Sequence, residues 1–141
     1  LRAFYAGGAG TVTETLFVLG GFFMILVVGG KGSGKREFVL KRLGCREEQI
    51  ADAVLDERPV VDHLETMVRS YLPKAEELLE PLSHKQVIIC DEVGCGVVPL
   101  DREENQWREQ VGRLCVELAK RACCVVRIQC GIPVVLKGEL P

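Results

Sequence analysis

The stretch Met24-Ile-Leu-Val-Val-Gly-Gly-Lys-Gly-Ser-Gly-Lys35 decides the fold, because an apolar run passes directly into a glycine-rich loop. Met24 to Val28 has the length and apolar character of a buried β-strand. Gly29 to Lys35 satisfies the first part of the phosphate-binding pattern G-x-x-x-x-G-K-[ST]. Helical spacing follows from Lys35 to Leu43, and Gly44 suits the left-handed cap that ends a helix. This strand, loop and helix predict the first unit of a P-loop α/β domain.

Glycines in such a loop let the backbone curl, so that successive N–H groups and the start of the helix converge on phosphate oxygens. Lys35 would supply a mobile positive charge to the terminal phosphates. We therefore expect ATP or GTP as the ligand. The predicted binding residues are Gly29, Gly30, Lys31, Gly32, Ser33, Gly34, Lys35 and Arg36. The alternative is a flexible glycine-rich turn that binds nothing.

Arg36 stands at the eighth position of the pattern, where a Ser or Thr hydroxyl normally ligates Mg²⁺. A guanidinium group carries only donors and cannot bind a cation. Two interpretations stay open. Mg²⁺ is held only by carboxylates and phosphates, or the loop binds an anion without productive Mg²⁺ chemistry.

Carboxylates follow two predicted strands at the edge of the sheet where the loop would lie. Asp62 follows the short run Val60-Val61, and Asp91-Glu92 follow the apolar run from Val87 to Cys90. We predict Lys35, Asp62 and Glu92 as catalytic residues, and Asp62 and Asp91 as metal ligands. The alternative is that these acids cap a neighbouring helix or pair with Arg36.

The rest of the chain alternates short apolar runs with helical periodicity, which is typical of βαβ units around a mostly parallel sheet. An apolar helical face runs from Leu64 to Leu72 and a second one from Trp107 to Leu118. Pro73 marks a boundary, and a further helical piece covers Lys74 to Glu80. The run Cys123 to Cys130 predicts a closing strand.

Three further features are less informative about chemistry. The polar segment Cys45 to Arg58 is ambiguous and is interpreted as one short helix through Ile50 and Val54. His63 and His84 are interpreted as surface or helix-start residues. Cysteines in or beside apolar runs are expected to behave as small buried hydrophobic residues, and these are Cys90, Cys123, Cys124 and Cys130.

Bulk properties exclude several classes of protein. The chain has 141 residues, 48% of them hydrophobic and 27% charged, as expected for one globular domain. A net charge of −2 leaves no basic surplus for nucleic acid. Seven cysteines without a C-x-x-C spacing favour free thiols in the cytoplasm over a metal site. The uncharged run Thr15 to Gly30 is shorter than a membrane span, so no membrane partner is expected.

Residues 1–23 are interpreted as a leader segment, because Met24 is a natural start for a domain whose first strand leads into a P-loop. The domain boundaries expected are therefore 1–23 for the leader and 24–141 for a P-loop nucleotide-binding domain. The alternative is an extra strand, since Val12 to Val18 partly alternates between apolar and polar residues.

A family resemblance is carried by Asp91-Glu-Val-Gly-Cys-Gly-Val-Val-Pro99, which is similar to the E-V-G-x-G-[IV]-V-P motif of the bifunctional adenosylcobinamide kinase / adenosylcobinamide-phosphate guanylyltransferase family. Further elements resemble that family in the same order and spacing. They are Trp107-Arg108, Gly112-Arg113, Leu118-Ala119, and Gly131-Ile132-Pro133 with Leu136-Lys137. The likeness extends from Met24 to Lys137.

The resemblance implies a three-layer P-loop fold of the RecA-like type, with a mostly parallel sheet and flanking helices, usually assembled as a homo-oligomeric trimer. It implies ATP or GTP, Mg²⁺ and cobinamide as ligands. Such enzymes phosphorylate the aminopropanol hydroxyl of adenosylcobinamide and then transfer GMP from GTP through a guanylyl-histidine.

The chain departs from this pattern at three points. The family places the nucleophilic histidine on a helix before the strand that ends in Asp62, but the segment Cys45 to Arg58 contains no histidine. Cys115-Val116 replace an expected Asn-Gln pair, and Arg36 replaces the loop hydroxyl. We therefore expect guanylyl transfer to be lost. Three hypotheses remain: an enzyme that keeps the kinase half-reaction, a catalytically degenerate nucleotide or anion sensor, and a P-loop kinase with another acceptor.

Overall fold

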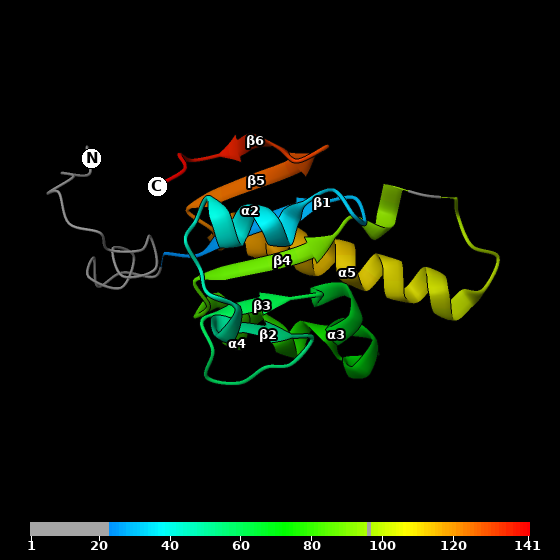
Figure 1. The fold of residues 1–141 in the computed structure, drawn as a ribbon. Helices are drawn as coiled ribbons and strands as arrows, with labels where there is room; N and C mark the ends of the chain where they lie inside the picture. The colour runs from blue at the N-terminus through cyan, green and yellow to red at the C-terminus, as the bar shows by residue number, and fades with distance from the viewer. Residues whose placement is uncertain (1–22, 96) are drawn as a thin grey trace, which may run out of the picture.

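A six-stranded sheet forms the centre of the computed structural model, which describes residues 23–95 and 97–141. The strand order is β2-β3-β4-β1-β5-β6, and only the last pair is antiparallel (Figure 1). The strands are β1 (Ile25–Gly29), β2 (Ile50–Asp52), β3 (Val60–Asp62), β4 (Val87–Asp91), β5 (Cys124–Gln129) and β6 (Ile132–Lys137). The prediction of a mostly parallel α/β sheet is confirmed.

Helices cover both faces of this sheet, which gives three layers (Figure 1). The α-helices are α2 (Lys35–Lys41), α3 (Leu64–Tyr71), α4 (Leu79–Ser83) and α5 (Arg102–Arg121). Short 3₁₀ turns are η1 (Glu47–Gln49), η2 (Ala75–Leu78) and η3 (Val93–Cys95). Helix α2 packs on one face, and the other three α-helices pack on the opposite face.

Strand β1 shows why the middle of the sheet reads as a continuous apolar run. Ile25 and Val27 pack with Phe38 and Val39 of α2, whereas Leu26 packs in the core formed with α3 and α5. All of these side chains are buried. Successive side chains of a strand point to opposite faces, so a strand covered on both faces needs apolar residues throughout.

Strand register brings the predicted acids to the edge of the sheet where the glycine loop lies. Gly29, the last residue of β1, is paired with Asp91 at the end of β4. Asp52 of β2 is paired with Asp62 of β3 in the same way. Since these strands are parallel, their carboxyl ends meet at one edge, and a loop that leaves β1 there is surrounded by carboxylates.

The structure corrects three expectations for individual segments. Cys45 to Arg58 does not contain the predicted helix, because η1 is followed by β2, which pairs with β3. Strand β6 extends the sheet where no element was expected after Cys130. Cys130 itself is exposed, because it lies in the tight turn between β5 and β6 with a positive φ of 52°.

The other predicted helices and strands are confirmed to within a few residues, including the boundary at Pro73 and the left-handed Gly44, whose φ is 70°. Residues 1–22 lie outside the described part, so the leader and the alternative strand from Val12 to Val18 stay predictions. Within the described residues, no helix combines the length and the apolar character needed to cross a membrane.

Candidate nucleotide site

The loop between β1 and α2 depends on glycine at two positions. Gly34 has a φ of 95°, and a Cβ atom there would lie 3.3 Å from the Cα atom of Gly131. A Cβ atom on Gly29 would lie 2.5 Å from the carbonyl oxygen of Ile128 in β5. The backbone N–H of Gly131 donates to the carbonyl oxygen of Ser33 at 2.8 Å. The β5–β6 turn therefore supports the loop from one side, and larger residues would displace it.

Lys35 lies at the base of this loop and is only 7% exposed. Its Nζ atom donates to the carbonyl oxygen of Gly30 at 2.6 Å and lies 2.7 Å from Oδ1 of Asp91. Because a buried ammonium group needs such partners, these two contacts hold the charge inside the loop.

Arg36 reaches across the edge of the sheet to the end of β3. Its Nη1 atom donates to Oδ2 of Asp62 at 3.0 Å, and its Nη2 atom donates to Oε2 of Glu47. The pKa of Arg36 is raised, chiefly by its hydrogen bond to Glu47. The other oxygen of Asp62 accepts the backbone N–H of His63 at 2.7 Å. The pairing of Asp62 with Arg36, one of the alternatives expected from the sequence, is therefore present.

Glu92 follows Asp91 and is held on both its backbone and its side chain. Its N–H donates to the carbonyl oxygen of Gly29 at 2.9 Å, and its Oε2 atom accepts from Arg127 of β5 at 3.0 Å. Glu65, a buried acid of α3, accepts the backbone N–H of Asp91 at 3.0 Å. These bonds connect α3, β4 and β5 around the end of the loop.

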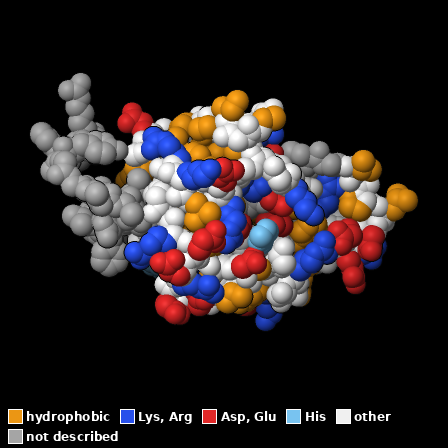
Figure 2. All heavy atoms as spheres, viewed as in Figure 1, with side chains coloured by type: hydrophobic (Ala, Val, Ile, Leu, Met, Phe, Trp, Pro, Cys, Tyr) orange, Lys and Arg blue, Asp and Glu red, His pale blue; other side chains and the backbone are white. Residues whose placement is uncertain are grey.

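A cavity of about 1160 Å³ opens over these residues. In Figure 2 a histidine lies in a hollow of this face, surrounded by acidic and basic side chains. The lining includes Lys31, Gly32, Gly34, Lys35, Arg36, Glu37, Asp52, Ala53, Asp62, His63, Glu65, Thr66, Arg69, Ile89, Asp91, Glu92, Val93 and Trp107. Most of the predicted site residues therefore border one cavity, and its volume exceeds that of an ordinary small-ligand pocket.

Two pairs in the cavity were not predicted from the sequence. Nδ1 of His63 lies 2.5 Å from Oδ1 of Asp52, and this hydrogen bond is the main cause of the raised pKa of His63. On the α3 and α5 side, the guanidinium carbon of Arg69 lies 3.8 Å from the ring centroid of Trp107. Trp107 donates to the carbonyl oxygen of Glu65 at 2.7 Å. His63 starts α3, as expected, but it also lines the site.

Mg²⁺ usually accompanies nucleotides in this class of fold, and the contacts here do not fit it. Both oxygens of Asp62 already accept hydrogen bonds, Asp91 is paired with Lys35, and the side chain of Arg36 is a donor only. Within residues 23–95 and 97–141, no group of three or more His, Cys, Asp or Glu residues is arranged to hold a metal ion. The assignment of Asp62 and Asp91 as metal ligands stays a prediction.

A parallel sheet with a glycine loop after its central strand, and a lysine enclosed by that loop, defines a P-loop α/β protein. The family model for cobinamide kinase / cobinamide phosphate guanyltransferase matches residues 47–136, more than half of the chain. The chain belongs to this family. Among curated proteins, none matches the chain.

Family membership connects the chain with cobalamin biosynthesis and with chemistry that uses nucleotides and cobinamide. The matched segment contains β2 to β5 and most of β6, together with Asp62, Asp91 and Glu92. It begins after the glycine loop. The assignment of Gly29 to Lys35 as a phosphate site therefore depends on the pattern and the geometry of the loop itself.

Proposed function

We propose that this chain is a kinase that transfers the terminal phosphoryl group of ATP or GTP to the aminopropanol hydroxyl of adenosylcobinamide. One observation carries the proposal: Nζ of Lys35 is enclosed by the loop, 2.6 Å from the carbonyl oxygen of Gly30, at the wall of a cavity of about 1160 Å³. That volume suits a nucleotide together with part of an acceptor. Family membership supports the acceptor class.

In this proposal backbone N–H groups of the loop between Gly29 and Lys35 bind the phosphates, apart from that of Ser33, which donates to the carbonyl oxygen of Gly30 at 3.1 Å. Lys35 exchanges Asp91 and the Gly30 carbonyl for phosphate oxygens and neutralises charge on the transferred group. Phosphoryl transfer depends mainly on positioning and on charge stabilisation, so a pre-placed lysine supplies much of what the reaction needs.

The two proposed catalytic acids have different roles. Asp62 is 4% exposed and forms an ion pair with Arg36. Its role in this proposal is to hold the guanidinium group of Arg36 in position. Glu92 lines the cavity beside the loop and is oriented by Arg127. We propose Glu92 as the group that accepts the proton of the acceptor hydroxyl. The proposal contains no step through Mg²⁺, because Asp62 is held by Arg36 and by the backbone N–H of His63.

Guanylyl transfer is not part of the proposal. That reaction needs a nucleophilic imidazole, and the segment expected to carry it contains η1 and β2 without a histidine. His63 is the histidine that lines the cavity, and its Nδ1 atom is engaged by Asp52. We also propose that residues 24–141 form one domain of a cytoplasmic homo-oligomer, by analogy with the family.

A second candidate function is regulatory binding: the chain would be a catalytically degenerate homologue that binds a nucleotide or another anion. The observation in its favour is that the acids at the loop are already neutralised. Lys35 pairs with Asp91, Arg36 with Asp62, and Arg127 with Glu92.

Transfer of a labelled γ-phosphate from ATP or GTP to adenosylcobinamide tests the kinase proposal. We expect labelled adenosylcobinamide phosphate with the wild-type protein and a loss of at least a hundredfold in Lys35→Met, because charge neutralisation of the phosphates is removed. Lys120→Met is the matched control, since Lys120 is exposed and pairs with Glu117, and both residues lie outside the cavity lining. Nucleotide binding without any transfer would favour the degenerate homologue.

A further inference from the structure

We propose that Arg36 takes the place of a divalent cation in this site, so that the loop binds the triphosphate of a nucleotide without Mg²⁺. The identity of the ligand as a nucleotide rests on the proposed function. The binding of the triphosphate by Arg36 is inferred from the contacts of Arg36 itself.

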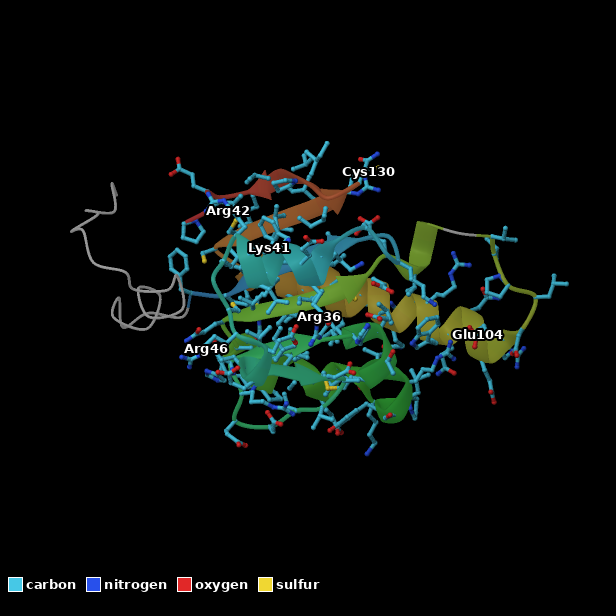
Figure 3. All side chains as sticks on the ribbon, in the orientation of Figure 1. Arg36, Lys41, Arg42, Arg46, Glu104 and Cys130 are labelled. Carbon is cyan, nitrogen blue, oxygen red and sulfur yellow. The ribbon has the colours of Figure 1, made fainter. Side chains whose placement is uncertain are left out.

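Arg36 directly follows Lys35 and extends over the cavity from the start of α2 (Figure 3). Its guanidinium group is fixed on one side by Asp62 of β3 at 3.0 Å and by Glu47 of η1. These two contacts therefore fix the plane of the guanidinium group.

The guanidinium group keeps donors for a ligand. It carries five N–H groups, and the two carboxylates use one on Nη1 and one on Nη2. The remaining N–H groups have a planar arrangement that matches the oxygens of a phosphate. Arg36 can therefore bridge a carboxylate and a phosphate at once, as a metal ion does.

Four acids of the cavity lining have a local partner other than Arg36, whereas Asp62 pairs with Arg36 itself and Glu65 accepts the backbone N–H of Asp91. Asp91 is paired with Lys35, Glu92 with Arg127, Glu37 with Lys41, and Asp52 with His63. Lys31 also lines the cavity from within the loop. A triphosphate placed over the loop is therefore close to the cationic side chains of Lys31, Lys35 and Arg36. Lys35 and Arg36 also hold ion pairs with the acids at the strand ends.

Calorimetric titrations with ATP, GTP and inorganic triphosphate, each in EDTA and in excess Mg²⁺, test the inference. We expect the wild-type protein to bind in EDTA at least as tightly as in Mg²⁺. Arg36→Ser should bind about tenfold to a hundredfold more weakly in EDTA, the effect of losing charge-assisted hydrogen bonds. Mg²⁺ should restore part of its affinity, because the new hydroxyl is a metal ligand.

Two further variants distinguish the effects of the charge and of the planar guanidinium group of Arg36 from a general loss of stability. Arg36→Lys keeps the charge without the planar fork and should fall between wild type and Arg36→Ser. It also provides the measurement if Arg36→Ser fails to fold. Arg46→Ser removes the same charge from an exposed arginine that pairs with Glu48, outside the cavity lining, and should bind like wild type (Figure 3).

The outcomes are distinct for this inference and for the proposed function. Wild-type binding at least tenfold weaker in EDTA than in Mg²⁺, or unchanged affinity of Arg36→Ser in EDTA, overturns the role of Arg36 and leaves the kinase proposal standing. Binding of inorganic triphosphate in EDTA with no binding of ATP or GTP overturns the kinase proposal and supports the role of Arg36.

Discussion

Lys35 and Asp91 form an ion pair in which Nζ and Oδ1 are 2.7 Å apart, although their residues lie 56 positions apart in the sequence. The pairing of Gly29 with Asp91 between β1 and β4 brings them together. Lys35 is almost fully buried, whereas the Asp91 side chain is 20% exposed. The lysine therefore depends on this carboxylate and on the Gly30 carbonyl while no phosphate is bound.

Asp91→Asn should lower the free energy of unfolding by about 1 to 3 kcal/mol, because it leaves the buried ammonium group without its charged partner. Chemical denaturation in urea measures the change. The double variant Lys35→Met with Asp91→Asn should be less destabilised than the sum of the two single variants, since neither charge is then left alone. Additive effects would contradict the importance of this pair.

Stability should also depend on Asp56 at low pH. Arg58 donates from its side chain and its backbone to Asp56 and so lowers the pKa of that carboxyl, and the same guanidinium donates to the carbonyl oxygen of Ile50 in β2. A carboxyl whose pKa is lowered by folding stabilises the folded state above its unfolded pKa. This contribution is lost as the pH falls through the folded pKa.

Comparison of wild type with Asp56→Asn across pH measures this effect. The difference in the free energy of unfolding should be largest at neutral pH, should begin to decline near the ordinary carboxyl pKa of 3.8, and should be lost only below the lowered pKa of the folded state. Glu57→Gln is the control, since Glu57 is an exposed neighbour outside this hydrogen-bonded group. A difference that persists unchanged in acid would mean that the charge on Asp56 is not the cause.

Cysteine labelling should separate buried from exposed thiols in the folded protein. Burial raises the pKa of Cys45 to about 11, whereas Cys130 is exposed in the β5–β6 turn. At about pH 8 only about one Cys45 thiol in a thousand would be ionised, and the thiolate is the form that reacts. Iodoacetamide should therefore modify Cys130 before Cys45. Fast modification of Cys45 in the folded chain, located by peptide mass analysis, would contradict its buried position.

The elements around the loop were predictable because their physical signals are local. An apolar run followed by Gly29 to Lys35 predicts a strand and a P-loop, and the spacing of Val111, Leu114 and Leu118 predicts the buried face of α5. These three side chains are buried in the structure. Asp62 and Asp91 were located at strand ends for the same reason.

Strands β2 and β6 could not be predicted in this way, because they are specified by their neighbours. β2 has three residues after a polar turn, and its pairing with β3 brings Asp52 beside His63. β6 contains Pro133, which counts against an interior strand, but an edge strand tolerates a residue that cannot donate. The contact between Asp52 and His63 could therefore not be predicted without β2.

The contact between Arg36 and Glu47 was missed for a related reason. The alternative of an Arg36 pair with Asp62 followed from placing both at the same edge of the sheet. Glu47 belongs to η1, in a segment for which the sequence predicts one short helix. Its position beside Arg36 depends on the path of the chain into β2. Long-range geometry of this kind is not encoded in residue spacing.

Amide chemical shifts of an isotope-labelled protein, followed by NMR during titration with ATP and with GTP, test the phosphate site most directly. We predict that the largest chemical-shift changes occur at the backbone N–H groups from Gly29 to Arg36. In Lys35→Met the apparent affinity obtained from these changes should be at least tenfold lower. Saturating changes confined to other parts of the chain, or no changes with either nucleotide, would contradict the phosphate site.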